Sequence, residues 1–233
     1  MQPTSNHLSL GSAHFTVDPL GALYWPEKRL LIVADLHLEK GSAYAARKIF
    51  LPPYDTSTTL ATLAALIARH APRRVLALGD SFHDGEAGDR VLAKDRAALA
   101  ALQSRREWIW LSGNHDPELP SDLGGDCCSE IMIGGIEFRH AADPDYEDHE
   151  IAGHLHPVAR VVGSAGSVRR RCFVSDGRRC ILPALGAYAG GLNLRDAAFA
   201  ALFARGARSE QIHAHVLGRD RVYKVSHRRC LPD

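Results

Sequence analysis

Five short apolar runs of the sequence are each followed at once by side chains that commonly bind metal ions. The runs lead into Asp35-Leu36-His37, Gly79-Asp80, Gly113-Asn114-His115-Asp116, Phe138-Arg139-His140 and Gly153-His154-Leu155-His156. Each segment alone is a weak signal, because a single Asp-x-His or Gly-Asp occurs in many turns. In α/β sheets, however, ligands bind beyond the carboxyl ends of the strands. Five runs that all deliver Asp, Asn or His to this position indicate a metal site rather than packing.

The donor atoms of this set are carboxylate oxygens, an amide oxygen and imidazole nitrogens, with no thiolate. Such donors suit Mn²⁺, Fe or Zn²⁺ better than Ca²⁺ or Cu(I). The set is too large for one tetrahedral site, so we expect two metal ions about 3.5–4 Å apart. A carboxylate can bridge two metals and an imidazole cannot, so one Asp should lie between them. Two such cations can activate water for attack on phosphorus and neutralise the charge that develops.

Four residues of these segments have open roles at this point. His154 and His156 alternate in an extended chain, so they point to one side, roughly 6–7 Å apart along the backbone. They can hold one metal together or one metal each. His115 is left over from the donor set and can give a proton to a departing alkoxide. Asp116 either orients His115 or caps the following turn.

The strands and helices that must position these residues can also be predicted. Apolar runs typical of buried strands alternate with segments of helical periodicity, in the order 30–34, 55–72, 73–80, 88–105 and 107–116. In the first predicted helix, Leu60, Leu63 and Ile67 fall on one face. The β-α-β-α-β order predicts a largely parallel sheet with helical crossovers.

The second half of the sequence changes to hairpins. Residues 130–140, 170–183 and 211–225 predict hairpins that turn at Gly134-Gly135, at Asp176-Gly177 and near Gly218, and residues 194–206 predict a helix. No repeat or linker divides the chain, so we expect a single domain over residues 1–233, built as an α/β fold of two packed sheets with helices outside.

Composition sets the general class of the protein. The 233 residues are 45% hydrophobic and 24% charged, as in an ordinary globular protein. The formal net charge is +1, so any site for a polyanion must be a local patch. The five cysteines have no zinc-finger spacing, and the sequence shows neither a signal peptide nor a membrane span. We therefore expect a cytoplasmic protein with reduced thiols and no membrane partner.

The ordered motifs "DLH", "GD", "GNHD", a single His and "GHLH" resemble those of the calcineurin-like metallophosphoesterases. The resemblance implies a four-layer sandwich of two mixed β-sheets flanked by α-helices, with a binuclear site. It also implies the role of each residue: Asp35, His37 and His156 on the first metal, Asp80 as the bridge, Asn114, His140 and His154 on the second metal, and His115 as the catalytic histidine.

A narrower resemblance lies outside these motifs. The stretches "RKIFLPPYDTSTTLATL" and "ILPALGAYAGGLNLRDAAFAALF" are similar to the bacterial ligase-associated DNA damage response endonucleases of the PdeM type. This implies a manganese-dependent DNA endonuclease that works with a helicase and a DNA ligase in repair. Physically, "LPPYDT" is typical of a rigid turn into a helix, and "GAYAGGLN" of a Gly-rich loop that lies close to another segment.

The second motif departs from the shorter form of the family. It reads "GDSFHD", so Asp84 stands further from Asp80, and His83 lies beside the site. His83 either contacts the scissile phosphate, and so counts among the catalytic candidates with His115 and Asp116, or merely packs.

Features that favour DNA as the substrate are local. Basic clusters occur at residues 169–171, 178–179 and 228–229, and they can grip phosphates. For any single cluster, a solvated surface is the better explanation. Tyr54 and Tyr188 either stack on bases or pack in the core or at its rim. We take Arg47, Asp84 and Tyr188 as candidate substrate-binding residues. The low net charge favours single strands over duplex DNA.

Three functions follow from these features. The leading hypothesis is a two-metal, Mn²⁺-dependent DNA phosphodiesterase. The alternative is a phosphoesterase for nucleotides or cyclic nucleotides, which needs the same metal core and a different pocket. A non-catalytic metal-binding scaffold is disfavoured, because every donor position is filled and His115 is present.

Overall fold

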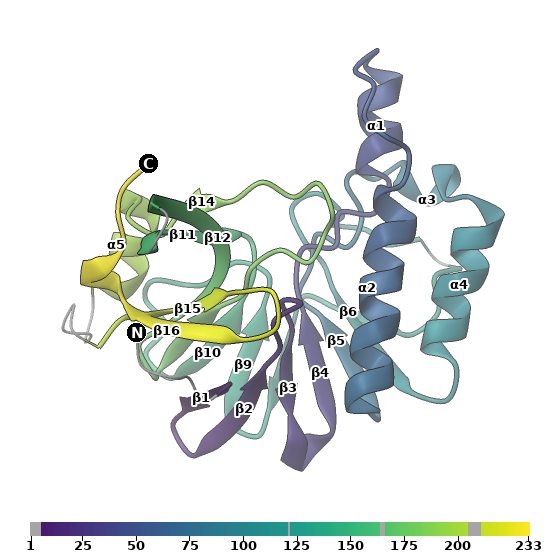
Figure 1. Ribbon diagram of the computed structural model, residues 1–233. Helices are drawn as coiled ribbons and strands as arrows, with labels where there is room; N and C mark the ends of the chain where they lie inside the picture. The colour runs from purple at the N-terminus through teal and green to yellow at the C-terminus, as the bar shows by residue number, and fades with distance from the viewer. Residues whose placement is uncertain (1–5, 121, 164–165, 205–210) are drawn as a thin grey trace.

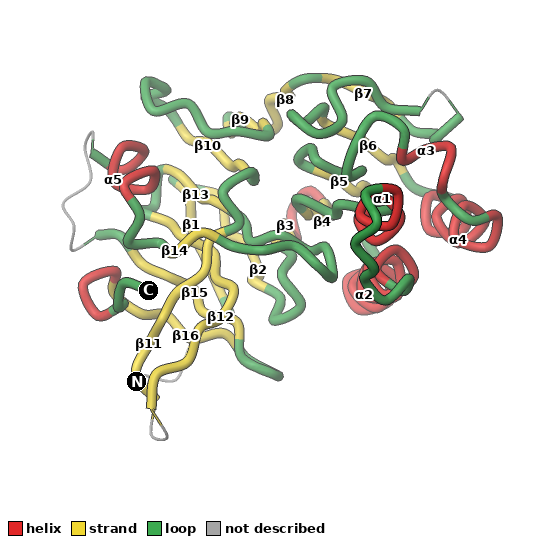
Figure 2. The backbone as a smooth tube through the Cα atoms, turned by 90° about the horizontal axis from the view of Figure 1, so that it is seen from above, coloured by secondary structure: helices red, strands yellow, loops and turns green. Residues whose placement is uncertain are grey.

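The computed structural model describes residues 6–120, 122–163, 166–204 and 211–233. Within these ranges, two mixed β-sheets pack face to face, and helices cover their outer faces (Figures 1 and 2). The α/β four-layer sandwich expected from the sequence is therefore confirmed. No helix among the described residues is long and apolar enough to span a membrane.

The first sheet has seven strands in the described part of the chain, hydrogen-bonded in their sequence order. They are β1 (His7–Leu10), β2 (Ala13–Val17), β3 (Leu23–Trp25), β4 (Leu30–Val33), β5 (Arg74–Ala77), β6 (Glu107–Leu111) and β7 (Asp126–Cys128). Neighbours from β4 to β7 are parallel, as the β-α-β-α-β pattern predicts. The strands β1 to β3, which sequence reasoning missed, extend this sheet in an antiparallel manner.

The second sheet has the order β14-β11-β12-β13-β10-β9-β8, and β15 and β16 join it beside β12. Its strands are β8 (Glu130–Ile133), β9 (Ile136–Arg139), β10 (His149–Ala152), β11 (Pro157–Gly163), β12 (Gly166–Ser175), β13 (Arg179–Ile181), β14 (Leu192–Asn193), β15 (His213–Leu217) and β16 (Val222–Ser226). The parallel pair β9 and β10 matters for the site, because both strands end at the same edge.

The helices cover the two outer faces as predicted. On the first sheet lie α2 (Asp55–His70) and α4 (Ala93–Gln103), whose apolar faces form one buried core with β4, β5 and β6. The predicted apolar face of α2 is buried. A second core fills the space between the sheets, and a third lies between the second sheet and α5 (Ala197–Phe203). The short α1 (Lys40–Ala46) projects beyond α2 (Figure 1).

Two local predictions need correction. The helix predicted over residues 88–105 is split into α3 (Ala87–Arg90) and α4, because Val91 and Leu92 are extended, with ψ of 122° and 145°. The predicted end of the helix over 194–206 lies outside the described residues. The two-residue turn at Asp176-Gly177 is a four-residue loop instead, since Ser175 pairs with Cys180. The hairpins at Gly134-Gly135 and near Gly218 form as predicted.

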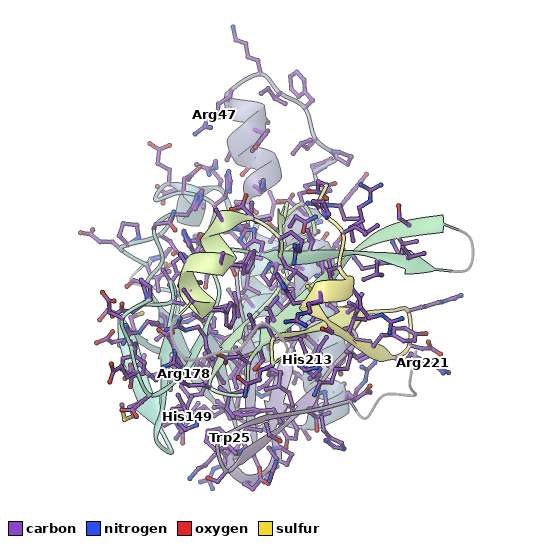
Figure 3. All side chains as sticks on the ribbon, turned by 90° about the vertical axis from the view of Figure 1, so that its left-hand side faces the viewer. Trp25, Arg47, His149, Arg178, His213 and Arg221 are labelled. Carbon is purple, nitrogen blue, oxygen red and sulfur yellow. The ribbon has the colours of Figure 1, made fainter. Side chains whose placement is uncertain are left out.

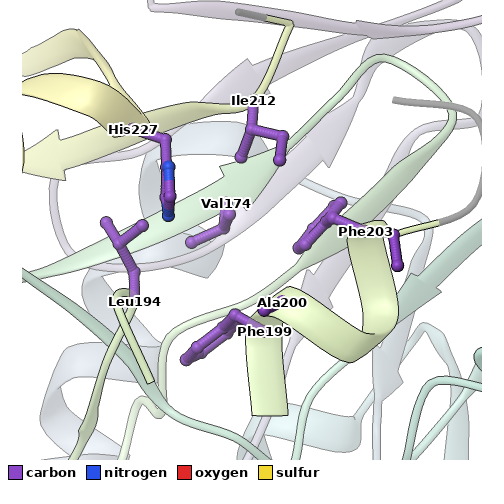
Figure 4. Close-up of a pocket in the computed structure, with 8 residues that line it drawn as sticks. Val174, Leu194, Phe199, Ala200, Phe203, Ile212 and His227 are labelled. Atoms are coloured by element: carbon purple, nitrogen blue, oxygen red, sulfur yellow. The ribbon is translucent and has the colours of Figure 1, made fainter. Parts of the chain in front are cut away.

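The third core is incompletely filled. An apolar cavity of about 250 Å³ lies between α5 and the second sheet, lined by Val174, Phe199, Phe203 and Ile212 among others. Figure 4 shows the His227 ring across this cavity from the α5 side chains. His227 belongs to the short 3-10 helix η2 (His227–Arg229); a similar turn, η1 (Pro26–Lys28), follows β3.

Candidate active site

The seven predicted metal donors meet at one edge of the sandwich. They follow the carboxyl ends of β4, β5 and β6 in the first sheet and of β9 and β10 in the second. Because both sheets present this edge on the same side, donors up to 121 residues apart in the sequence come together there. The structure arranges them as two clusters that share Asp80 as a neighbour.

The first cluster contains Asp35, His37 and His156. The Nε2 atom of His156 lies 3.2 Å from the Nε2 atom of His37 and 3.2 Å from Oδ1 of Asp35. One donor atom from each of the three residues lies within 4.8 Å of the others. This is the spacing at which three side chains can hold one cation.

The second cluster contains Asp80, Asn114, His140 and His154. The Nε2 atom of His140 lies 2.9 Å from Oδ1 of Asn114, 3.4 Å from Oδ1 of Asp80 and 3.2 Å from Nδ1 of His154. The other oxygen of Asp80, Oδ2, lies 3.9 Å from Nε2 of His37, which belongs to the first cluster. Asp80 therefore faces both clusters, one with each oxygen.

A cation fits the second cluster on the chemistry of its donors. The Nδ1–H group of His140 donates to the carbonyl of Leu78 at 2.9 Å, which leaves its Nε2 atom facing the site. Three acceptor atoms surround that nitrogen, so a proton or a metal ion is needed to relieve their mutual repulsion. Burial alone would lower the pKa of His140, but contact with Asp80 and Asp35 raises it.

The protonation states of the other donors suit metal binding. Burial, then the charge of His156, lowers the pKa of His37 to about 3. Burial and the charge of His140 also lower the pKa of His154. Burial alone would raise the pKa of Asp80, but the hydrogen bond and charge of His140 bring it to about 2. Neutral imidazoles and an ionised carboxylate are the forms that bind a metal.

Five of the seven donors have a left-handed backbone: Asp35, His37, Asp80, His154 and His156, with φ between 42° and 67°. For residues other than glycine this conformation costs on the order of 1 kcal/mol each, and it persists only where the surroundings impose it. Hydrogen bonds impose it here. The His37 N–H donates to the Asp80 carbonyl at 2.9 Å, and the His154 N–H donates to the Asp35 carboxylate at 3.1 Å. Each of these loops is thus held in place by a hydrogen bond with another loop that carries a metal donor.

Asp116 braces the site through the backbone. Its carboxylate accepts N–H groups from Asp80 at 3.0 Å, Phe82 at 2.9 Å and Gly113 at 3.0 Å. Only glycine fits at position 113, because a Cβ there would lie 2.3 Å from the Asp80 nitrogen. Burial, with the charge of Asp80, raises the pKa of Asp116 to about 6, while the N–H groups of Phe82 and Gly113 act in the opposite sense. The described contacts of Asp116 include none with the His115 ring, so it fills neither role that the sequence left open.

His115 and His83 lie side by side at the mouth of the first cluster. Their rings stack with centroids 5.1 Å apart, and each ring also contacts that of His37. The Nδ1–H group of His115 donates to the His83 carbonyl at 2.7 Å, so its Nε2 atom faces Asp80 Oδ2 at 4.0 Å. Burial, with the charge of Lys40, lowers the pKa of His83 to about 4.

The three candidate substrate-binding residues lie outside both clusters. Asp84 is paired with Arg90, which donates to both of its oxygens at 2.7 and 2.8 Å. The Tyr188 hydroxyl donates to the carbonyl of Pro52 at 2.9 Å. Arg47 ends the projecting α1 (Figure 3) and reaches the site only through its charge, which lowers the pKa of His83 slightly. None of these three side chains contacts a donor among the described residues.

Sequence reasoning missed how the Gly-rich segment after β13 supports the donors. The N–H groups of Leu185 and Gly186 donate to the carbonyls of Ala34 and Asp35 at 2.9 and 3.0 Å. A Cβ on Gly186 would lie 2.4 Å from the Leu36 carbonyl oxygen. A Cβ on Gly191 would likewise lie 2.7 Å from the carbonyl oxygen of His156. The loop therefore approaches other backbone closely, as predicted. Its neighbours are the segments that carry Asp35 and His156, the first and last donors of the first cluster in the sequence.

Gly186→Ala is expected to destabilise the fold by about 1–3 kcal/mol, because its Cβ must push backbone rather than a side chain. The displaced loop carries Asp35 and His37, so activity should fall as well. Gly190→Ala is the matched control, since nothing lies within 4 Å of a Cβ there. Thermal melting of both variants measures the difference. Equal melting temperatures would show that the Leu36 loop yields freely.

Comparison with known proteins agrees with this geometry. The family described as calcineurin-like phosphoesterase matches residues 28–184, a span that holds all seven donors. The chain belongs to this family. As a calcineurin-like phosphoesterase it is a hydrolase of the metallophosphoesterase type, and the two clusters are its candidate binuclear metal centre.

Among solved structures, one resembles this calcineurin-like phosphoesterase over almost its whole length. The nuclease MPE of Pseudomonas putida is 26% identical, over 94% of this chain and 98% of that chain, with a TM-score of 0.71. The phosphoesterase YfcE of E. coli is 13% identical over 84% of this chain and 98% of that chain, and its TM-score is 0.40. No curated protein sequence is significantly similar. The match to MPE supports membership of the nuclease subgroup that the flanking stretches indicated.

Proposed function

We propose that the protein is a two-metal phosphodiesterase that cuts DNA internally, with Mn²⁺ as its metal and single strands as its preferred substrate. The observation that carries this proposal is the complete donor set, in two clusters that Asp80 faces with separate oxygens. The similarity to a nuclease over almost the whole chain supports the phosphodiester substrate. Work alongside a helicase and a DNA ligase is part of the same proposal and rests on sequence resemblance.

The metal assignment follows the two clusters. Asp35, His37 and His156 would hold the first ion. Asn114, His140 and His154 would hold the second, with Asp80 between them. When bound, two such cations supply charge neutralisation for the phosphoryl group and an activated water. Oxygen and imidazole donors without a thiolate fit Mn²⁺, Fe or Zn²⁺, and we take Mn²⁺ as the working metal.

The protein's own acid would be His115. Its Nδ1–H group is fixed on the His83 carbonyl, so Nε2 is the atom that can carry a proton to the leaving oxygen. Its side chain is 38% exposed, which leaves room for a substrate to reach it. The backbone contacts of Asp116 make it a positioning residue for the Asp80 loop.

His83 would act beside His115 on the substrate. One ligand atom from each of His37, His83 and His115 lies within 4.8 Å of the others, so a phosphate next to His115 also lies next to His83. The Nδ1 atom of His83 is buried and has no hydrogen-bond partner in the described part of the chain. Tyr44 of α1 packs against the His83 ring, with centroids 5.7 Å apart. This contact joins the site to the projecting helix.

The surface most suited to unpaired bases lies at the end of α1. Phe50 is 84% exposed and Tyr54 is 64% exposed, and the exposed cations Arg47 and Lys48 precede them. Exposed aromatic rings beside cations are typical of single-strand binding, where bases stack on the rings. Helix α1 connects the segment that carries His37 to this loop. A single DNA strand that crosses the metal site can therefore reach the loop.

The basic clusters contribute less than the sequence indicated. Arg179 is buried and paired with Glu150, with Nε 2.5 Å from Oε2. Arg171 is half-buried and donates to the carbonyl of Ala184 at 2.8 Å. Arg169 is exposed and pairs with Asp233 at 3.2 Å. The prediction that these clusters grip phosphates is therefore wrong for Arg179.

Substrate competition tests the proposal. The Mn²⁺-loaded protein is offered circular single-stranded DNA, the matching duplex circle, bis-p-nitrophenyl phosphate and p-nitrophenyl phosphate. We expect the diester and the single-stranded circle to be cut, the circle about tenfold faster than the duplex because only unpaired bases can stack. Rapid monoester hydrolysis without DNA cleavage would favour a small-molecule phosphoesterase. Bound metal without any turnover would favour a scaffold.

Phe50→Ser separates the DNA surface from the metal centre in the same experiment. One lost base stack is worth about 1–3 kcal/mol, so KM for single-stranded DNA should rise about fivefold or more. Hydrolysis of bis-p-nitrophenyl phosphate, which is too small to reach Phe50, should be unchanged. An equal loss of activity on both substrates would show that this loop does not bind DNA.

A further inference from the structure

A polar cavity lies in the second sheet, at the edge opposite the metal centre. Its volume is about 500 Å³, within the range of small-molecule sites. Side chains of β1, β12, β15, β16 and the loop after β12 line it, including His7, Ser175, Asp176, His213, His215 and Lys224. Figure 3 shows His213 in the half of the molecule remote from Arg47 and α1.

Strand register explains why these side chains share one face. His213 pairs with Ser175 of β12, and His215 pairs with Lys224 of β16. Because side chains two residues apart point to the same side, both pairs open into the same cavity. An exposed strand would also explain the alternating histidines in "QIHAHVL". In the structure, both histidines line this pocket.

His215 is the unusual member of this set. It is only 4% exposed, and no hydrogen bond to its ring is present among the described residues. Burial, followed by the charges of Lys224 and His213, lowers its pKa to about 4. A ligand in the cavity would give this ring the partner that the protein does not.

The charges of the cavity favour an anion over a cation. Among the described residues, the histidines of this cavity do not converge in the manner of metal ligands. The Lys224 ammonium, for which the described contacts include no ion pair, repels cations and attracts anions. The single carboxylate, Asp176, is turned to its own loop, where Oδ1 accepts the N–H groups of Arg178 and Arg179 at 2.9 and 2.8 Å. The Ser175 hydroxyl adds a donor beside His213.

We propose that this cavity binds a phosphate-class oxyanion, either inorganic phosphate or the phosphate group of a mononucleotide, at a site separate from the metal centre. Lys224 is the charged contact, and His215 and Ser175 supply hydrogen bonds. The Nδ1–H group of His213 donates to the carbonyl of Gln211 at 2.8 Å, so His213 would contact the anion through its Nε2 atom in the protonated state. The loop that carries Asp176 lies beside the amino end of β10, whose carboxyl end leads to His154. The two sites are thus separated by at least the length of that strand, about 13 Å.

The test uses the full-length protein loaded with diamagnetic Zn²⁺, so that histidine ring signals stay sharp. Inorganic phosphate and adenosine monophosphate are titrated at constant ionic strength while nitrogen-detected NMR follows each ring, with His215 assigned by loss of its signal in His215→Gln. We expect a saturable shift of the His215 ring with Kd below about 1 mM. Saturation by the nucleotide alone would identify a nucleotide site, and equal saturation by both would identify a phosphate site.

Lys224→Met should weaken this binding about tenfold or more, because it removes a charge-assisted hydrogen bond. Lys94→Met, which changes an exposed lysine on α4, is the matched control. The proposal is overturned if His215 does not shift below about 10 mM ligand, if shifts are confined to the metal-centre histidines, or if both lysine variants bind equally. Because the readout is the His215 ring, it is independent of DNA cleavage.

Discussion

Asp80→Asn is expected to lower kcat/KM for a phosphodiester by about 10³-fold or more. The substitution keeps the shape of the side chain and removes its charge. Oδ1 of Asp80 lies 3.4 Å from His140 and Oδ2 lies 3.9 Å from His37, so the same carboxylate faces both clusters. A neutral amide cannot bridge two cations, and the loss should therefore be greater than that of one terminal donor.

Two measurements make this result specific to the bridge. Metal content, measured on the gel-filtered variant, should fall below two ions per chain while the melting curve stays cooperative. Asp89→Asn, at an exposed aspartate on α3, should retain full activity and both metals. If Asp80→Asn kept more than about a tenth of the activity, Asp80 would not be the bridge.

His115→Gln is expected to slow DNA cleavage by about 10²–10⁴-fold, the usual contribution of general acid catalysis. The same variant should lose much less on bis-p-nitrophenyl phosphate, because nitrophenolate leaves without a proton. The ring of His115 is held by the His83 carbonyl rather than by either cluster of donors, so both metal ions should stay bound.

The ratio of the two losses decides the role of His115. Rates are measured on single-stranded DNA and on the nitrophenyl diester, with metal content checked in the same samples. Equal losses on both substrates would contradict the acid role and point to ground-state binding. His14→Gln controls for the general loss of an imidazole. His14 lies on β2 and bonds Ser9 of the neighbouring β1.

The donors could be predicted from the sequence because of where they stand. Asp35, Asp80 and Asn114 follow buried parallel strands, and strand direction alone sends their side chains to one edge. The pairing of His154 with the second cluster and His156 with the first could not be derived from spacing. It depends on the left-handed backbone at both histidines, which the surrounding loops impose and no local signal reports.

Other features depend on partners that are distant in the sequence. The loop after β12 has four residues because Asp176 bonds the N–H groups of Arg178 and Arg179, which overrides the Asp-Gly turn signal. Arg179 looked like a surface cation, yet Glu150, 29 residues away, pairs with it inside the protein. Gly186 carries no side-chain chemistry at all. It matters because the absence of a side chain lets the Leu36 carbonyl come close.

Both metal clusters take donors from both sheets: His156 of the second sheet meets Asp35 of the first, and His140 of the second meets Asp80 of the first. Bound cations would therefore link the two sheets directly, in addition to the apolar core and the hydrogen bonds that already join them. Catalysis and mechanical cohesion would then depend on the same bonds. A variant that loses a donor would loosen the sandwich as well as stop the reaction, and a cell that starves the protein of metal would weaken its structure together with its activity.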